Sequence, residues 1–393
     1  MTGAPLARAP WAIRDLVYGI VFIGVLIGLS YGLDAIPIVG MAYYNRIIVM
    51  IGINITLAVS LNIINGHAGQ FSLGHAGFMA VGAYFAAYLT VYHFGPYVEK
   101  IAEGTTQAWI AQNALLLFAV LAGGVVAALA GYIVGLPSLR LRGDYLAIVT
   151  LGFGEIVPRV IRNASKFTGG VNGIVGTDQP MIPAFLGFHG YSFGLNPVPY
   201  YYLMLVIIVI TILLIRNLRN SRLGRAWMAV REDEVAAAAT GINTVTTKLL
   251  AFALGASFSG FAGSYYASKL FIVTPETFSF VVSVTVLLMV VLGGMGNIRG
   301  VIVGALVIYA IQAYVLVQLP GWIASATQAL DIGFLNNVDI SGYVQRSSIL
   351  IFGVILVVIM LLRPQGLIPS AQRKVELELG TTEEAVSDLR GSA

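Results

Sequence analysis

The sequence contains no cysteine and few charged residues, and each absence excludes a class of protein. Without cysteine there is no disulfide framework, no thiol catalysis and no cysteine-ligated metal. Charged residues make up only 10% of the 393 residues, whereas soluble domains carry about 25%. Because 58% of the residues are hydrophobic and the mean hydropathy is +0.86, a water-soluble fold is excluded and a membrane protein is predicted.

Ten apolar segments approach or reach the length of about 20 residues that crosses the hydrocarbon of a bilayer. They are 16–33, 47–65, 70–92, 114–136, 144–158, 200–215, 249–272, 278–293, 300–317 and 347–362. The segment 144–158 is short and contains Glu155, so it fits a full span, a broken helix or a re-entrant piece. The predicted fold is an all-α polytopic membrane protein of about ten transmembrane segments, some broken or re-entrant.

Basic residues set the expected orientation, because Lys and Arg resist translocation and remain in the cytoplasm. They gather in a few segments between apolar runs and form no nucleic-acid-binding face, and the densest segment is 216–248. A cytoplasmic N-terminus at 1–15 and a transmembrane domain at 16–367 place this loop inside. The polar tail 368–393 is then also cytoplasmic, and we expect it to be disordered. One basic cluster falls outside in this count: Arg159, Arg162 and Lys166.

Residues 66–77, GHAGQFSLGHAG, repeat one motif and place His67 eight residues before His75. Eight residues is just over two helical turns, so both histidines could project from one helix face. A metal site is disfavoured, because zinc needs at least three protein ligands and no third candidate is near. Hydrogen bonding to backbone freed by the glycines is the better interpretation, and it also suits the rim of a pathway.

Small residues recur at four-residue spacing, which permits close helix packing in a membrane. The series are Ala68, Ser72, Ala76 and Ala80; Gly255, Ser259, Gly263 and Ala267; and Gly296, Gly300 and Gly304. Ordinary packing is the simpler interpretation, and a hinge at these positions or at Gly74 and Gly77 is the alternative.

Within the basic loop, Glu234, Ala236, Ala237 and Gly241 form an E-x-A-A-x-x-x-G pattern. On a helix, Glu234, Ala237 and Gly241 would share one small, smooth face that begins with an acid. Such a face suits insertion into a partner's groove, and a solvated surface helix is the alternative.

This loop resembles the signature loop of permease subunits of bacterial ABC importers, in the form found in LivM-type branched-chain amino acid permeases. Val235 stands where the general importer signature has Glu, which matches the LivM-like variant. The resemblance runs from about residue 45 to 367 and is carried by SLNIINGHAGQFSLGHAGFMAVGAYFAA at 60–87, LRLRGDYLAIVTLGFGEI at 141–156, TGGVNGI at 168–174, GRAWMAVREDEVAAAATGIN at 224–243 and VVLGGMGNIRGVIVGA at 290–305.

The resemblance implies an ATP-driven, high-affinity importer of Leu, Ile and Val in a bacterial cytoplasmic (inner) membrane. Its partners would be a second, related permease, two ATP-binding subunits and a periplasmic or lipid-anchored substrate-binding protein. No cofactor is expected in this chain, because none of its five lysines follows a glycine as a phosphate-binding loop requires. ATP and Mg would be bound by the ATPase subunits, so this chain is expected to be a transport subunit and not an enzyme.

The same resemblance implies two sets of site residues. Those that couple the loop to the ATPases would be Arg231, Glu234, Ala236, Ala237 and Gly241. The main polar side chains beside the glycine-rich segment would line the substrate path: His67, Gln70, Ser72, His75 and Glu155. For Glu155, a helix-end carboxylate paired with Arg159 is an equal alternative.

Other functions remain as alternatives. A urea or short-amide importer would have the same architecture. An ion-coupled secondary transporter would usually carry more carboxylates within its spans. A membrane enzyme would need an acid, base or metal cluster, and the sequence offers none beyond Glu155 and the two histidines.

Overall fold

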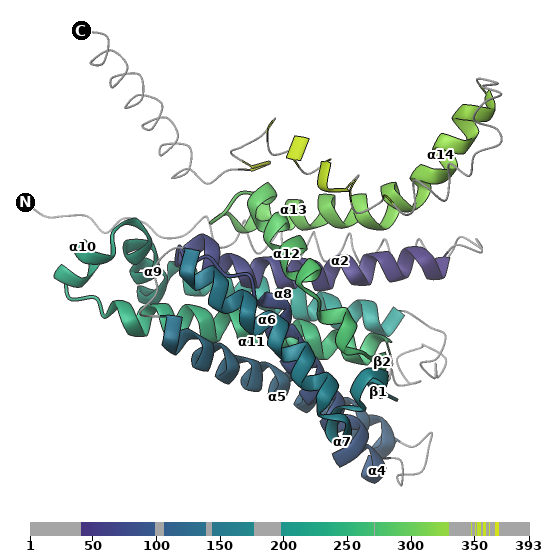
Figure 1. Cartoon of the computed structure of the whole chain (residues 1–393). Helices are drawn as coiled ribbons and strands as arrows, with labels where there is room; N and C mark the ends of the chain where they lie inside the picture. The colour runs from purple at the N-terminus through teal and green to yellow at the C-terminus, as the bar shows by residue number, and fades with distance from the viewer. Residues whose placement is uncertain are drawn as a thin grey trace, which may run out of the picture.

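The computed structural model describes residues 41–98, 106–138, 144–176, 198–270 and 272–329, with short pieces between 347 and 368. Long helices lie side by side in one bundle, and α9 and α10 project from one end of it (Figure 1). The α-helices are α2 (Met41–Asn62), α3 (His75–Tyr88), α4 (Gly95–Val98), α5 (Thr106–Ser138), α6 (Asp144–Asn163), α7 (Ser165–Thr168), α8 (Val198–Asn220), α9 (Arg222–Glu232), α10 (Glu234–Ala239), α11 (Thr244–Leu270), α12 (Phe280–Gly293), α13 (Ile298–Ala310) and α14 (Leu316–Ala329). Short helical turns are η1 (Ile63–His67), η2 (Leu89–Phe94), η3 (Gly170–Asn172), η5 (Pro275–Phe278) and η6 (Ile311–Val315).

Five helical stretches are long and apolar enough to cross a membrane, which makes the chain a polytopic membrane protein. They are Ile47–His67, Ile110–Pro137, Leu203–Asn220, Thr244–Leu270 and Ile298–Trp322. Each coincides with a predicted span, at 47–65, 114–136, 200–215, 249–272 and 300–317. The predicted span 278–293 is the shorter apolar helix α12.

Two predicted segments, together with the chain termini, fall largely outside the described residues. The span 16–33, the N-terminal segment 1–15 and nearly all of the tail 368–393 are not described, and only parts of 347–362 are. The count of ten segments and the extent of the domains therefore stay predictions.

The helix in the predicted span 70–92 begins later than expected. Residues 68–74 are not helical, and α3 begins only at His75. Gly69 has a φ of +66°, a conformation that ends the helical turn η1 and that side chains with a Cβ rarely adopt. The expectation that His67 and His75 share one helix face is therefore wrong. So is the expected helical series that begins at Ala68.

The segment 144–158 is neither short nor broken. It forms α6, a helix of 20 residues that continues to Asn163. Near its start, Thr150 contacts the loop before α3, and near its end Arg162 contacts Glu276, which precedes α12. The helix is less apolar than the five stretches above because it carries Glu155, Arg159 and Arg162.

The helical fold contains a small β-structure. Strands β1 (Ile174–Val175) and β2 (Ile272–Val273) pair antiparallel, with Ile174 opposite Val273. The pair joins the segment after α6 to the connection between α11 and α12. Gly173 permits this approach, since its φ is +72° and a Cβ there would strike the Val273 carbonyl.

Glycines set the packing of α11 and α13. On α11, a Cβ at Gly255 would lie 2.7 Å from the Ile64 side chain, and one at Gly263 would strike the Met79 backbone. Helix α11 therefore packs against η1 and α3. Gly300 and Gly304 bring α13 against α12 in the same way. Gly296 differs, because it lies in the turn between α12 and α13 with a φ of +81° and is not on a helix face.

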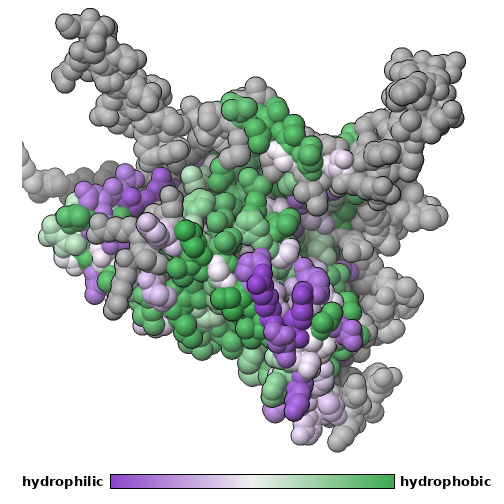
Figure 2. Space-filling view, in the orientation of Figure 1, coloured by the Kyte–Doolittle hydropathy of each residue, from purple (hydrophilic) through white to green (hydrophobic). Residues whose placement is uncertain are grey.

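Hydrophobic residues cover the middle of the bundle, and polar residues gather at its two ends. Figure 2 shows one hydrophilic region over α9 and α10 and another toward α7, with a hydrophobic band between them. The outer side of α5 exposes an apolar ridge: Leu117, Leu121, Val125, Leu129, Ile133 and Leu136. In a membrane protein, such a ridge is available to lipid or to another membrane subunit.

Candidate transport site and coupling loop

The start of α3 is held by side chains from four helices: α2, α6, α11 and α12. The contacts are Leu73 N–H to Thr150 Oγ1 at 3.0 Å, Ala76 N–H to Ser283 Oγ at 3.0 Å, Ser259 Oγ–H to the His75 carbonyl at 3.1 Å, and His75 Nε2 with Ser60 Oγ at 2.7 Å. Non-helical backbone within a membrane bundle is tolerated where protein groups bond its freed N–H and C=O groups. These contacts therefore stabilise the break at 68–74.

A cluster of neutral polar side chains lies at this break, and we call it the polar cluster. Its members are Asn62, Asn65, His67, Gln70, Ser72 and His75. Each has an exposed fraction of 7% or less. Each also has one side-chain atom without a hydrogen-bond partner in the described part of the chain: Asn62 Nδ2, Asn65 Nδ2, His67 Nε2, Gln70 Oε1, Ser72 Oγ and His75 Nδ1.

These unpaired atoms distinguish the polar cluster from ordinary packing. A buried polar group left without a partner costs about 1–3 kcal/mol, and native structures contain few of them. The cluster offers both donors, such as the Asn62 and Asn65 amides, and acceptors, such as Gln70 Oε1 and Ser72 Oγ. Donors and acceptors are therefore gathered in one buried place.

Asn62 and Asn65 were not among the residues expected from the sequence. Both stand in an otherwise apolar run, LNIING, and two amides at membrane depth were a usable signal. The oxygen of each side-chain amide already accepts a hydrogen bond. Asn62 Oδ1 accepts from Gly296 N–H at 2.8 Å, and Asn65 Oδ1 accepts from Ser72 N–H at 3.3 Å.

Glu155 does not join the polar cluster. Its carboxylate pairs with Arg159 at 3.4 Å, and 42% of its side chain is exposed. This is the arrangement of the alternative interpretation, a helix-end carboxylate with a basic partner one turn on. The preceding residue Gly154 does pack against Gly74, so α6 contacts the break through glycine backbone. Gly77 lies against the same helix, because a Cβ added to Gly77 would lie 2.9 Å from the Phe153 ring.

The loop 216–248, which is expected to couple to ATPase subunits, forms the short helices α9 and α10 between the end of α8 and the start of α11. Ser221 Oγ accepts from Gly224 N–H at 3.3 Å at the start of α9. Asp233 ends α9 and caps α10, where its carboxylate accepts from Val235 N–H at 2.8 Å and from Ala236 N–H at 3.0 Å. Such side-chain caps satisfy the first N–H groups of a helix.

Gly241 ends α10 and does not extend its face. The φ of Gly241 is +87°, and the N–H groups of Gly241 and Ile242 bond to the Ala238 and Ala237 carbonyls at 3.0 and 3.1 Å. This is the Schellman arrangement, for which glycine is preferred. The expected helix face that joins Glu234, Ala237 and Gly241 is therefore wrong, because the helix ends at Ala239.

The side chains of α10 divide between the bundle and solvent. Glu234 pairs with Lys248 at 2.6 Å, and Ala237 is buried against this chain. Ala236 is exposed, and 70% of Val235 is exposed. The surface of α10 that a partner can reach is therefore formed by Val235, Ala236, Ala238 and Ala239.

The inner side of α9 is fixed to the bundle by Trp227 and Arg231. Trp227 is almost fully buried, and its indole N–H donates to the Thr247 carbonyl at 2.8 Å. Arg231 Nη1 donates to the Gly66 carbonyl at 2.7 Å. The sequence analysis did not single out Trp227, although a tryptophan within a basic loop indicates an anchor.

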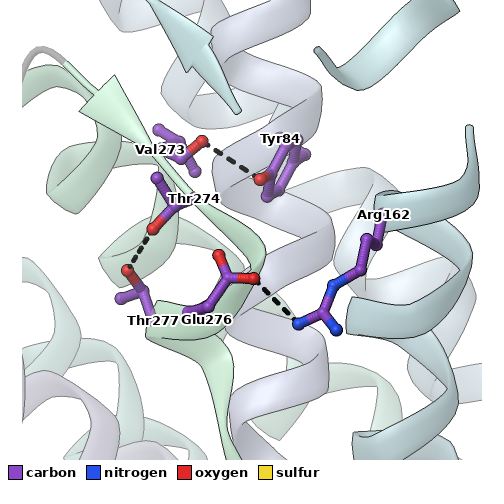
Figure 3. A network of polar contacts seen from close by, with 6 residues as sticks. All are labelled: Tyr84, Arg162, Val273, Thr274, Glu276 and Thr277. Atoms are coloured by element: carbon purple, nitrogen blue, oxygen red, sulfur yellow. Dashed lines mark hydrogen bonds and ion pairs between the residues drawn. The ribbon is translucent and has the colours of Figure 1, made fainter. Parts of the chain in front are cut away.

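The opposite end of the bundle carries an exposed polar network (Figure 3). Arg162 from α6 pairs with Glu276 from η5 at 2.8 Å, and about half of each side chain is exposed. Tyr84 from α3 donates its hydroxyl to the Val273 carbonyl at 3.0 Å. These contacts join α3 and α6 to the connection between α11 and α12.

Comparison with known proteins identifies the family. Residues 43–361 match the family described as "Branched-chain amino acid transport system / permease component". The chain belongs to this family. Its members are permease components, so this chain is a transport subunit and not an ATPase.

Three relatives illustrate the relationship. The high-affinity branched-chain amino acid permease protein LivM of Salmonella typhimurium is 35% identical over 84% of this chain and 70% of its own length. A probable LivM protein of Methanocaldococcus jannaschii is 30% identical over 83% of this chain and 93% of its own length. The LivH permease protein of S. typhimurium is 33% identical over 24% of this chain and 31% of its own length. No solved structure matches the chain.

Proposed function

We propose that this permease belongs to a high-affinity, ATP-driven importer of Leu, Ile and Val in a bacterial cytoplasmic membrane. The observation that carries the proposal is the similarity to LivM over 84% of the chain. The bundle is consistent with it, because the chain combines apolar spans, a buried polar cluster and a basic loop that forms a compact protrusion.

The importer would contain a second permease of the LivH type, two ATP-binding subunits and a periplasmic or lipid-anchored binding protein. The partial match to LivH supports a related second permease. ATP and Mg would bind in the ATPase subunits, since no lysine of this chain stands in a phosphate-binding loop.

The polar cluster would form part of the substrate path. A branched-chain amino acid at neutral pH is a zwitterion, so its carboxylate needs donors and its ammonium group needs acceptors. The Asn62 and Asn65 amides supply donors, and Gln70 Oε1 and Ser72 Oγ supply acceptors. The members of the cluster carry no carboxylate or guanidinium, and the Arg231 guanidinium lies beside them at the Gly66 carbonyl. Glu155 would take no direct part, because it faces Arg159.

The α9–α10 end would face the cytoplasm and receive the ATPases. Its basic residues favour that side of the membrane. The C-terminal segment supports the same orientation, because Leu367 N–H bonds to the Leu292 carbonyl at 2.7 Å, near the α12–α13 turn at this end. Leu367 therefore lies at the α9–α10 end, and the polar tail that follows it in the sequence is expected on the cytoplasmic side. Helix α6 would cross the membrane and carry Arg162 to the periplasmic side.

Transport would follow alternating access. Closure of the ATPase dimer would push α10, and α9 would pass the movement to the spans. The break at 68–74 would then change shape and expose the polar cluster first to one side of the membrane and then to the other.

Uptake by the reconstituted complex tests this function. The chain would be assembled in liposomes with the permease, ATPase and binding-protein partners encoded beside it, and labelled leucine and urea would be compared. We expect leucine uptake that requires ATP and persists when proton and sodium gradients are collapsed. Uptake of urea alone would favour the amide-importer alternative, and loss of uptake without gradients would favour a secondary transporter.

A further inference from the structure

One arginine joins the coupling loop to the helix break. Arg231 lies in the last turn of α9, and its Nη1 donates to the Gly66 carbonyl at 2.7 Å. Gly66 belongs to η1, the last helical turn before the non-helical residues 68–74. This hydrogen bond therefore connects the loop to η1, the turn that follows α2, across 165 positions of sequence.

Glycines make the space that the Arg231 side chain occupies. A Cβ at Gly69 would lie 2.6 Å from Arg231 Cγ, and a Cβ at Gly296 would lie 3.2 Å from its Nη1. Both glycines also have positive φ values, +66° and +81°. Gly296 N–H in turn bonds to Asn62 Oδ1. Arg231 thus lies where α9, the break after α2 and the α12–α13 turn meet.

The charge of Arg231 suits this position. The last carbonyl groups of a helix lack intrahelical partners, and a cation near them is favourable. Gly66 supplies such a carbonyl at the end of η1. An arginine is preferable to a lysine here, because its planar fork directs donors to fixed positions at once.

Trp227 makes α9 a rigid connection. It precedes Arg231 by four residues, so both side chains project from the same side of the helix. Trp227 holds the start of α11 through Thr247, while Arg231 holds the end of η1. Movement of α9 therefore displaces both elements.

We propose that Arg231 is a positioning residue of transport: it carries the movement of α9 and α10 to the helix break and so to the polar cluster. Two members of the cluster, Asn62 and His67, flank Gly66 on the same turns. The proposal rests on the proposed function, because it assumes that ATPase subunits act on the coupling loop.

The test is the amount of leucine taken up per ATP hydrolysed by the reconstituted complex. In Arg231→Met the side chain still covers Gly69, but the donors and the charge are lost. We expect the ratio to fall about fivefold to a hundredfold, the range that coupling between sites usually spans, while ATP hydrolysis continues. Complexes that fail to assemble lower both uptake and hydrolysis, so they do not change the ratio.

Two further variants sharpen the test. Arg231→Lys keeps a charge and a donor, so its ratio should lie between those of Arg231→Met and the natural protein. If Arg231→Met does not assemble, a reduced ratio in Arg231→Lys supports the proposal and an unchanged one overturns it. Arg225→Met removes a charge from the same helix, where Arg225 bonds only locally to the Asn220 carbonyl at 3.1 Å. Its ratio should stay within about twofold of the natural protein.

An unchanged ratio in Arg231→Met overturns the proposal. An equal loss in Arg225→Met also overturns it, because loss of positive charge would then explain both results. If the natural complex takes up no leucine, the proposed substrate is wrong. Arg231 is then judged by the stimulation of ATP hydrolysis by the binding protein, which Arg231→Met should abolish and Arg225→Met should retain.

Discussion

At the α9–α10 end of the bundle, the Arg231 side chain lies among Gly66, Gly69 and Gly296, where an added Cβ would meet it or its neighbours. At the opposite end, Arg162 and Glu276 pair at 2.8 Å with 48% and 51% of their side chains exposed. The Arg231 contact depends on the backbone shape of the glycines around it. Water can replace the partners of the exposed Arg162–Glu276 pair. Exposed ion pairs contribute about 0–1 kcal/mol, so the second contact can open at little cost.

The difference indicates what each end can do in a transport cycle. A close-packed joint transmits movement, because its parts cannot be displaced independently. An exposed ion pair permits α6 and the start of α12 to separate and close again. We therefore expect substitutions at the α9–α10 end to impair transport more than substitutions at the other end.

The largest effect is expected for Gly69→Val. A β-branched residue at a φ of +66° is strained by about 1–2 kcal/mol, and its Cβ would displace Arg231. Leucine uptake by the reconstituted complex should fall at least about tenfold, as a loss of about 1.4 kcal/mol in coupling would produce. Gly152→Val is the matched control, because no atom lies within 4 Å of a Cβ at Gly152. Equal losses in both variants would contradict a special role for the joint.

Gly241 tests whether a partner contacts the end of α10. Within the described part of this chain nothing lies within 4 Å of an added Cβ, so a side chain there has room unless a partner subunit covers it. Gly241→Leu should lower uptake about tenfold, the cost of overpacking an interface by roughly 1–3 kcal/mol. Gly241→Asn tolerates the left-handed conformation and isolates the effect of size. Normal uptake in Gly241→Asn would show that strain, not contact, explains the leucine variant.

A smaller effect is expected for Glu234→Gln. The Glu234–Lys248 pair is intermediate between an exposed and a buried pair, because Lys248 is only 13% exposed. Thermal unfolding of the complex should report a loss of about 1–3 kcal/mol. The double variant Glu234→Gln with Lys248→Met leaves no unpaired charge and should recover part of the stability. If the single and double variants unfold alike, the pair does not hold α10 to α11.

The smallest effect is expected for Glu276→Gln. It breaks the exposed pair with Arg162, so stability should change by at most about 1 kcal/mol and uptake by less than about twofold. Raising the salt concentration should shrink the difference further, since salt screens exposed charges. Thermal unfolding at low and high salt measures this. A loss as large as that of Glu234→Gln would remove the contrast between the two ends.

The length of the apolar runs predicted most of the long helices, and the errors arose where local backbone geometry or charge sets the end of a helix. Five predicted spans coincide with long apolar helices, because a run of about 20 apolar residues has few other stable forms in a membrane. The prediction failed at 68–74, since apolar content does not reveal that Gly69 adopts a positive φ. It also ended α6 too early, because the charges at Arg159 and Arg162 concealed a helix that continues past the apolar stretch.

Closeness in sequence shows which polar residues of one short segment lie together, but not which residues of other segments join them. The polar residues of the motif 66–77 do lie together, since one short segment carries them. Their neighbours Asn62 and Asn65 were missed, and Glu155 lies apart from them beside Arg159, because sequence distance does not give the direction of a side chain. The Arg231–Gly66 contact joins segments 165 positions apart, and no local pattern indicates it.

The central claim is that the polar cluster opens to water during an ATP-driven cycle, and a cysteine at Ser72 tests it most directly. Ser72 is fully buried, and the chain has no native cysteine, so Ser72→Cys would be the chain's sole thiol. Val175→Cys at the opposite end is the control, because 53% of Val175 is exposed. The complex would be reconstituted with cysteine-free partners and treated with a small water-soluble methanethiosulfonate reagent.

We expect labelling of Ser72→Cys to be slow at rest, to accelerate when ATP and loaded binding protein are added, and to slow again with excess leucine. Val175→Cys should be labelled readily in every state. A rate at Ser72→Cys that is equally slow in every state, in a complex that still transports leucine, would contradict a path through the polar cluster.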